Sequence, residues 1–403
     1  MFVIGAECSR CGEVFSSENI LTVCPDCGGA LLFKYDLTRV AEKISKSDLA
    51  NRENTFWKFK ELLPLSSPSS IVSLGEPYTP LIHYSEGNSS VSNVFLKDDG
   101  RLPTGTFKAR GMAVAVSNLK ELNINRVALP SAGNAAAALA AYGAKAKMDA
   151  YVFMPKDAPE SNVKECVFMG ARVYLVDGLI NDAADIMKKF EKAYGWLNVS
   201  TNKQPYRFEG YKAMAFETSE QFHWDFPDNI IFPTGGGEGV IGLWKGFKDL
   251  IELGWIEKIP RLIIVQSSGC APLVKAYNNG ETEVKEAWEN AETVAAGLRV
   301  GRPYASYLVL RAVRETKGMA VAVDDADILS SMKRFLQNGV YACPEASATL
   351  AALNKLKSDG AIDKDESVLL YLTGNAMKNF DFMKIEKNKI PVLTKDADFL
   401  PQC

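Results

Sequence analysis

The residues with the clearest capacity for chemistry lie around one lysine, in the run Leu102-Pro103-Thr104-Gly105-Thr106-Phe107-Lys108-Ala109-Arg110-Gly111. Its proline and glycine predict a tight turn between an extended segment and a helix over 108–121. Lys108 would then sit in small, partly apolar surroundings, and poor solvation favours the neutral, nucleophilic amine. Lys108 is therefore a candidate to form a Schiff base with an aldehyde. Taken alone, the run is better explained as a surface lysine beside a glycine turn, but two further sites change that balance.

A glycine-rich run follows the strand predicted over 229–232. It reads Pro233-Thr234-Gly235-Gly236-Gly237-Glu238-Gly239 and leads into a helix predicted over 239–253. Glycines at a strand-to-helix turn let several backbone N–H groups converge on an anion, and the helix N-terminus adds a positive dipole end. The run lacks the Gly-Lys-Ser/Thr ending of a nucleotide P-loop. We interpret it as a phosphate-binding loop with the Glu238 carboxylate directed away from the phosphate; a mobile glycine loop is the alternative.

Two other predicted strands end in small polar residues. One leads into Pro130-Ser131-Ala132-Gly133-Asn134. There the N–H groups and the Ser131 hydroxyl can bind a carboxylate and the Asn134 amide a ring hydroxyl, although serine and asparagine are also ordinary helix caps. The other strand ends at Thr373. The carboxyl ends of strands are where open α/β sheets bind ligands, so Thr373 is a candidate contact, with a helix cap as the alternative.

The polar stretch 198–210 joins the two halves of the chain and contains Arg207. A guanidinium can bind a phosphate or a carboxylate through two parallel hydrogen bonds. A solvated linker explains the stretch about equally well.

Histidine chemistry is excluded on simple grounds. The chain has two histidines, His83 and His223, and neither lies in a motif. A serine- or cysteine-histidine triad or a histidine metal site is therefore not expected. The chemistry must come from a lysine together with a cofactor.

Two Cys-x-x-Cys pairs near the N-terminus could hold a metal. They are Cys8-Ser9-Arg10-Cys11 and Cys24-Pro25-Asp26-Cys27. Four thiolates at this spacing suit one tetrahedral zinc and leave no open coordination position, so the zinc would be structural. The alternative is a ribbon that keeps its shape with free thiols, since disulfides are disfavoured in a reducing compartment.

Composition narrows the class of protein. The chain has 403 residues and a formal net charge of −3, which suits about two domains and gives no sign of nucleic-acid or anionic-membrane binding. Its apolar runs are too short for a membrane span, and its first residues lack the features of a secretory signal. We expect a cytoplasmic protein.

Strands and helices alternate from about residue 92, which predicts an α/β fold with mostly parallel sheets in three α/β/α layers. Two such series, the second beginning near residue 229, predict two lobes with a cleft between them. The expected strands are 93–97, 126–129, 149–154, 171–176, 229–232, 262–266 and 367–372, and the expected helices are 108–121, 134–144, 160–169, 181–195 and 239–253.

The ordered set of motifs resembles the fold-type II pyridoxal-phosphate enzymes, most closely the threonine synthases. The matching runs are residues 103–108 (Schiff-base lysine), 131–134 (asparagine loop), 205–212 (arginine for substrate phosphate), 235–239 (phosphate loop) and 373–374 (threonine facing the pyridine nitrogen), with further likeness at 293–300, at 343–346 and in the cysteine ribbon. The resemblance spans nearly the whole chain.

This resemblance implies a homodimeric lyase that uses pyridoxal 5′-phosphate and a phosphorylated amino acid. The reaction would be the γ-elimination and β-replacement that convert O-phospho-L-homoserine and water into L-threonine and phosphate. The implied cofactor contacts are Phe107, Lys108, Asn134, Gly235, Gly236, Gly237, Glu238, Gly239 and Thr373; the implied substrate contacts are Thr104, Thr106, Ser131, Ala132, Gly133, Ser200, Asn202 and Arg207. The expected units are a zinc-ribbon-like hairpin (1–38), a large cofactor domain (39–110 and 205–403) and a small substrate domain (111–204).

Two departures from the threonine synthase pattern leave alternatives open. Ala109 stands where an aspartate usually follows the lysine, and the glycine loop leans toward that of threonine dehydratases. Other possible reactions are β-replacement on O-phosphoserine, as in a cysteate synthase, and a threonine or serine dehydratase activity. A non-enzymatic alternative is a zinc-ribbon adaptor with an inactive body, but the ribbon mixes Arg10 with several acidic residues rather than presenting a basic face.

Overall fold

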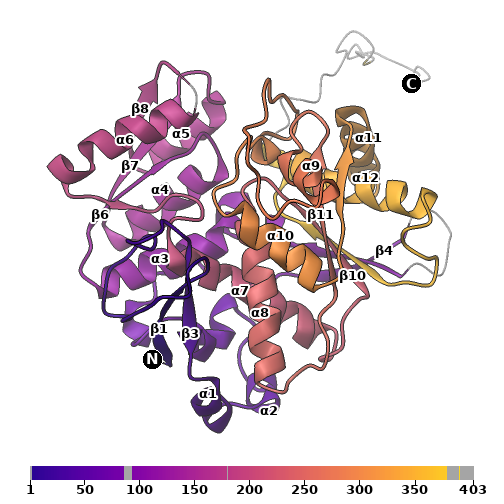
Figure 1. Cartoon of the computed structure of the whole chain (residues 1–403), viewed down its shortest axis with the longest axis horizontal. Coiled ribbons are helices and arrows are strands. Elements are labelled where there is room, and N and C mark those ends of the chain that lie inside the picture. The colour runs from indigo at the N-terminus through magenta and orange to yellow at the C-terminus, as the bar shows by residue number, and fades with distance from the viewer. Residues whose placement is uncertain (1, 86–92, 179, 379–389, 391–403) are drawn as a thin grey trace, which may run out of the picture.

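The computed structural model describes residues 2–85, 93–178, 180–378 and 390. Its strands form two open α/β sheets and one small N-terminal sheet, and Figure 1 shows the two α/β lobes side by side, with β6, β7 and β8 in one and β10 and β11 in the other. None of the helices in these residues is long and apolar enough to cross a membrane.

The larger sheet has six strands in the order β12-β11-β10-β13-β5-β4. Only the edge pair β4–β5 is antiparallel; the other neighbours pair in parallel. The bounds are β4 Leu81–Tyr84, β5 Val94–Asp98, β10 Asn229–Pro233, β11 Arg261–Ser267, β12 Ala320–Val323 and β13 Val368–Leu372. Every residue of the central strands β10 and β13 is buried, because helices cover both faces of the sheet.

Side-chain alternation along these strands separates two apolar cores. Ile230 and Phe232 of β10 pack in the core with α7 (Pro205–Gln221), α8 (Glu238–Glu252) and α10 (Ser306–Glu315). Ile231 points to the opposite face and packs in a second core. The helices of that second core are α11 (Asp325–Gln337) and α12 (Pro344–Ser358).

The smaller sheet is wholly parallel, with four strands in the order β8-β7-β6-β9. Helices α4 and α5 pack on one side of it and α6 on the other. The bounds are β6 Arg126–Pro130, β7 Asp149–Pro155, β8 Arg172–Val176, β9 Leu197–Asn198, α4 Asn134–Ala146, α5 Glu160–Phe168 and α6 Ile180–Tyr194. The predicted two-lobed α/β fold with mostly parallel sheets is confirmed.

The central helix of the molecule was not predicted from the sequence. Residues 205–221 form α7, which is buried from Pro205 to Ser219, so the solvated-linker interpretation is wrong for this part of the 198–210 stretch. Its polar residues misled the prediction because their charges are paired inside the protein rather than hydrated. Helices α9 (Pro272–Asn278) to α12 were likewise not predicted.

Helix α7 packs against α3 (Lys108–Glu121) and α8. A Cβ atom on Gly210 would lie 2.1 Å from the Arg110 carbonyl oxygen, so only glycine permits this approach of α7 to α3. The three helices carry Lys108, Arg207 and Glu238 toward one point. The predicted domain boundary between residues 110 and 111 falls inside α3, and the three domain ranges stay a prediction.

The N-terminal segment forms a three-stranded antiparallel sheet in the order β2-β1-β3, rather than a simple hairpin. Its strands are β1 Val3–Cys8, β2 Val14–Phe15 and β3 Leu31–Tyr35, and the short helices α1 (Leu37–Lys43) and α2 (Lys46–Ala50) follow. Tyr307 of α10 joins this sheet to the larger lobe, since its hydroxyl lies 2.8 Å from Ser9 Oγ and accepts from the Ala30 N–H at 2.9 Å.

Candidate active site

Lys108 is the first residue of α3 and follows a strained turn. Thr104 has a φ of 61°, a left-handed conformation that is unfavourable for a β-branched residue, and Gly105 follows with a φ of 67°. The turn is tied to the end of β13, because the Phe107 N–H donates to the Thr373 carbonyl oxygen at 2.9 Å. Two segments far apart in the sequence thus hold the lysine at the carboxyl edge of the larger sheet.

The surroundings of Lys108 match the sequence-based expectation. Its side chain is 19% exposed, and Nζ lies 4.5 Å from the centre of the Phe107 ring. Burial lowers the pKa of Lys108; the nearby Glu238 opposes this effect and Arg207 adds to it. The prediction of a poorly solvated lysine with a lowered pKa is confirmed.

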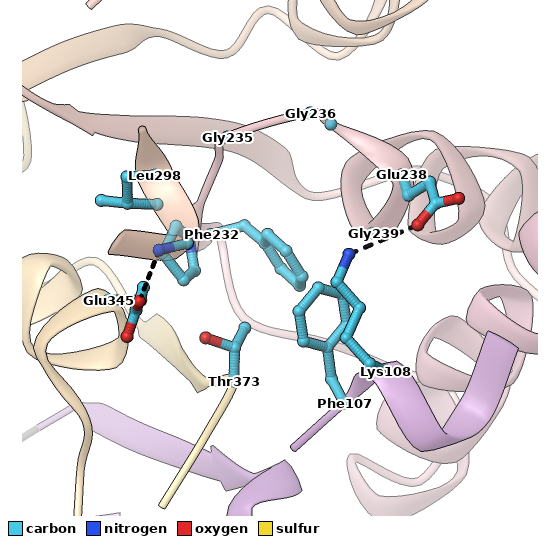
Figure 2. Close-up of a pocket in the computed structure, with 13 residues that line it drawn as sticks. Phe107, Lys108, Phe232, Gly235, Gly236, Glu238, Gly239, Leu298, Glu345 and Thr373 are labelled. Atoms are coloured by element: carbon cyan, nitrogen blue, oxygen red, sulfur yellow. Dashed lines mark hydrogen bonds and ion pairs between the residues drawn. The ribbon is translucent and has the colours of Figure 1, made fainter. Parts of the chain in front are cut away.

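Lys108 opens into a cavity at the carboxyl edge of the larger sheet, with about 350 Å³ of space, part of which is open to solvent. Figure 2 shows the ammonium group directed toward the glycine loop, with Phe107 and Thr373 beneath it. The lining residues are Phe107, Lys108, Phe232, Pro233, Gly235, Gly236, Gly237, Glu238, Gly239, Gly297, Leu298, Glu345 and Thr373. The fold brings together Lys108, the glycine loop and Thr373, as expected from the sequence.

The glycine loop is shaped to leave its backbone free. A Cβ on Gly235 would lie 2.3 Å from the Gly297 carbonyl oxygen, and one on Gly237, whose φ is +87°, would lie 2.1 Å from Val309 Cγ2. Within the described residues, no hydrogen bond engages the backbone N–H groups of 235–239. Several free donors at the start of α8 make a cradle for an anion.

The side chain of Glu238 is directed toward Lys108 rather than into solvent. Its Oε2 atom lies 3.3 Å from Lys108 Nζ and 2.6 Å from Arg207 Nη2, and its Oε1 atom accepts from the Asn202 N–H at 2.9 Å. Figure 2 shows the carboxylate facing the lysine. The sequence predicted only that this carboxylate would point away from a phosphate, and neither cationic partner was expected.

Arg207 lies inside the protein and not on a solvated linker. Its side chain is fully buried on α7, where Nη1 donates to the Val199 carbonyl oxygen at 2.7 Å and Nη2 pairs with Glu238. The Nε atom has no hydrogen-bond partner in the described structure. Arg207 is outside the lining of the cavity, so its predicted role in binding substrate phosphate stays a prediction.

The remaining predicted substrate residues are near the lysine turn or in the smaller lobe. The buried hydroxyls of Thr104 and Thr106 have no hydrogen-bond partner in the described structure. Residues 131–134 lie at the start of α4 and outside the cavity lining, with the Ala132 carbonyl accepting from Asn162 Nδ2 at 2.8 Å. The Ser200 hydroxyl donates to Asn198 Oδ1, and Asn202 Nδ2 donates to the Gly236 carbonyl oxygen at 2.5 Å.

Part of the cavity wall was not predicted. Glu345, at the start of α12, accepts from the Gly297 N–H at 2.7 Å, and Leu298 lies beside it. The runs 293–300 and 343–346 had been noted only as points of resemblance. Both runs lie at the carboxyl edge of the sheet because of contacts such as that between Gly297 and Glu345, which are 48 positions apart in the sequence. A local sequence pattern cannot predict such a contact.

Residues 72–374 match the family described as "Pyridoxal-phosphate dependent enzyme". This chain belongs to that family. Among curated relatives of this pyridoxal-phosphate-dependent enzyme, a protein named threonine synthase from Methanocaldococcus jannaschii is 34% identical over 380 residues, which cover 93% of each chain. A threonine synthase from Methanosarcina acetivorans is 34% identical over 379 residues, 93% of this chain and 92% of the relative.

Solved structures share the fold of this pyridoxal-phosphate-dependent enzyme. Maize serine racemase superposes with a TM-score of 0.63 at 22% identity, covering 74% of this chain and 88% of its own. A pyridoxal 5′-phosphate-dependent aspartate racemase gives a TM-score of 0.64 at 20% identity, covering 78% and 92%. At this identity the likeness concerns the fold alone.

The cavity fits the cofactor that defines the family. Lys108 offers a half-buried amine with a lowered pKa, which favours the nucleophilic form that bonds to an aldehyde. The free N–H groups of 235–239 suit a phosphate, and a Cβ at Gly235 or Gly237 would disrupt the loop. Thr373 lies between these groups and the far wall formed by Leu298 and Glu345 (Figure 2).

Proposed function

We propose that this enzyme is a threonine synthase that converts O-phospho-L-homoserine and water into L-threonine and phosphate. The main support is the pair of curated threonine synthases that match 93% of this chain at 34% identity. The poorly solvated Lys108 beside a glycine loop suited to an anion supports the same class of chemistry.

Lys108 is the proposed acid–base group of this reaction. Pyridoxal phosphate, when bound, supplies an aldehyde for Lys108 and a ring that withdraws electrons from the substrate. Because its burial favours the neutral amine, Lys108 can remove the proton from the substrate Cα and return protons to the neighbouring carbons. Thr373 is neutral and cannot keep a ring nitrogen protonated as a carboxylate would, which favours elimination.

Substrate binding is proposed to use hydroxyl, amide and guanidinium groups around the cavity. Thr104 and Thr106 hold buried hydroxyls that no described residue engages. The turn Ser131-Ala132-Gly133 is proposed for the α-carboxylate and Asn134 for a ring hydroxyl. Arg207, with Ser200 and Asn202 nearby, is proposed for the leaving phosphate; because Nη2 already pairs with Glu238, its unpartnered Nε is the donor most available.

The substrate is tested by incubating the holoenzyme separately with O-phosphohomoserine, O-phosphoserine and threonine. Inorganic phosphate and threonine appearing together from O-phosphohomoserine is the expected result. Phosphate released only from O-phosphoserine would instead indicate β-elimination, or β-replacement if added sulfite is incorporated into the product, and ammonia released from threonine would indicate a dehydratase. Either of these results, without turnover of O-phosphohomoserine, would contradict the proposal.

We also propose that the four N-terminal cysteines bind one structural zinc. Their Sγ atoms lie within 4.8 Å of one another, with Cys8 and Cys27 at 3.4 Å and Cys11 and Cys24 at 3.8 Å. A tetrahedral zinc with Zn–S bonds of about 2.3 Å places its sulfur ligands roughly 3.8 Å apart. The cluster therefore needs only small shifts to coordinate the ion, with Cys8 and Cys27 moving slightly apart and the more distant pairs moving closer.

Metal analysis is expected to find about one zinc per chain, as one tetrahedral four-thiolate site requires. Cys24→Ser should abolish zinc binding and speed proteolysis within residues 1–35, while the absorbance of the bound pyridoxal cofactor persists, because no cysteine of the cluster lines the cavity. Cys166→Ser, at a buried cysteine outside the cluster, is the matched control and should retain the zinc. Zinc retained by Cys24→Ser would contradict the site.

The enzyme is further proposed to act in the cytoplasm as a homodimer on a small-molecule substrate, in keeping with the family resemblance. Sedimentation equilibrium of the holoenzyme measures the association state, and a monomer at working concentration would contradict this part of the proposal.

A further inference from the structure

Glu238 has an unusual position for a carboxylate. It is the first residue of α8 and its side chain is completely buried, in the loop where the sequence suggests binding of another anion. Unpaired buried carboxylates are costly, and this one is held by a guanidinium, a backbone N–H and an ammonium group. The proposed chemistry uses Lys108 but gives Glu238 no task.

The fold determines where this carboxylate points. Gly237 caps α8 with a φ of +87°, which turns the chain so that residue 238 projects toward α7 and α3. Helix α8 also packs closely on α7, since a Cβ on Gly242 would lie 2.3 Å from Tyr211 Cβ. Arg207 is thereby fixed beside Glu238, and Lys108 reaches the same carboxylate from the start of α3.

One atom of Glu238 serves both cations. Oε2 lies 2.6 Å from Arg207 Nη2 and 3.3 Å from Lys108 Nζ, whereas Oε1 is held by the Asn202 N–H. A carboxylate needed only to neutralise Arg207 would not have to lie on the cavity wall, yet Glu238 lines the cavity together with Lys108. The shared oxygen therefore links the arginine to the lysine.

We propose that Glu238 is the positioning residue of Lys108: anchored by Arg207 and the Asn202 N–H, its carboxylate holds Nζ against the glycine loop and sets the proton affinity of the free amine. The inference rests on Lys108 as the cofactor-bearing lysine of this family and not on the identity of the substrate. It assigns Glu238 to the acid–base work of Lys108 and not to phosphate binding.

The charges around Lys108 determine whether Glu238 raises or lowers the pKa of its amine. Burial is the main cause of the lowered pKa of Lys108, and the ionised groups that act on this pKa are Glu238, which raises it, and Arg207, which lowers it. Glu345 lines the same cavity, but its Oε1 atom is engaged by the Gly297 N–H. Tyr211 is also close, with its ring centre 5.7 Å from Nζ, and burial raises the pKa of that phenol, which keeps it neutral.

The test measures the reactivity of Lys108 in the cofactor-free full chain. Acetic anhydride acetylates only the neutral amine, so the rate at which the Lys108 peptide is modified, followed by mass spectrometry across pH, gives the midpoint of its titration. Glu238→Gln keeps the size and removes the charge, and it should lower this midpoint by about one pH unit or more. Glu345→Gln is the matched control and should titrate like the wild type.

Two further variants separate positioning from a purely structural role. Arg207→Gln removes the opposing charge and should raise the Lys108 midpoint, the reverse of Glu238→Gln. Glu238→Asp restores the charge one methylene further from the lysine and should recover most of the wild-type midpoint, and it remains informative if Glu238→Gln folds poorly. A Glu238→Gln midpoint equal to that of the wild type, with only a lower melting temperature, would overturn the proposal.

Discussion

Lys108→Ala is expected to lose covalent attachment of pyridoxal phosphate and to lower kcat/KM by roughly 10³- to 10⁴-fold, the upper range for loss of a positioned acid–base group. The reason is that Lys108 is the one lysine lining the cavity, among the described residues, and its half-buried amine points at the glycine loop. The measurement is the mass of the denatured protein after borohydride reduction, together with steady-state kinetics.

A second lysine with a lowered pKa provides the matched control. Burial also lowers the pKa of Lys203, whose Nζ lies 4.9 Å from the Tyr304 ring centre and outside the cavity. Lys203→Ala should therefore keep the reducible cofactor bond. A reducible cofactor bond that persists in Lys108→Ala would refute the assignment of Lys108, whatever the result for Lys203→Ala.

Arg110→Met is expected to destabilise the fold by about 3–5 kcal/mol, the usual cost of removing one partner of a buried ion pair. Arg110 is fully buried on α3 and donates to Asp99 and Glu217 at distances of 2.6–2.9 Å. Without it, Lys97 alone remains to offset two buried carboxylates. The free energy of unfolding, measured by chemical denaturation of the holoenzyme, checks this value.

The ion pairs of Glu217 with Arg110 and Lys97 predict how the stability of the fold depends on pH. Burial by itself would raise the pKa of Glu217, but Arg110 and Lys97 outweigh it and lower that pKa to about 2, from 4.5 in the unfolded chain. A depressed pKa stabilises the fold above the unfolded value, and this contribution, about 3 kcal/mol, is lost as pH falls from about 5 to about 2.

The control for this titration is the variant itself. With Arg110 removed, the pKa of Glu217 should move back toward its ordinary value, so Arg110→Met should be less stable at neutral pH but lose less further stability between pH 5 and pH 2. Parallel stability curves for wild type and variant across that range would contradict the role given to the Arg110–Glu217 pair.

Local patterns identified most of what lies along the edge of the larger sheet. The helix predicted over 108–121 and the glycine loop before α8 were found from turn residues and strand–helix alternation. These signals depend only on residues that are close together in the sequence. Helix α7 was missed because its buried surface carries charge, as at Arg207 and Lys212, and charged stretches ordinarily indicate solvent.

By itself the sequence determined the α/β class, the lysine turn and the anion-binding loop, because glycine, proline and apolar periodicity constrain the backbone locally. The tertiary structure alone decided that Glu238 faces Lys108 and that Arg207 is buried against it. Those contacts join residues 130 and 31 positions apart, and their ion pairs form only because glycines let α7 pack closely on α3 and α8. Whether a carboxylate binds solvent or controls a lysine depends on that packing.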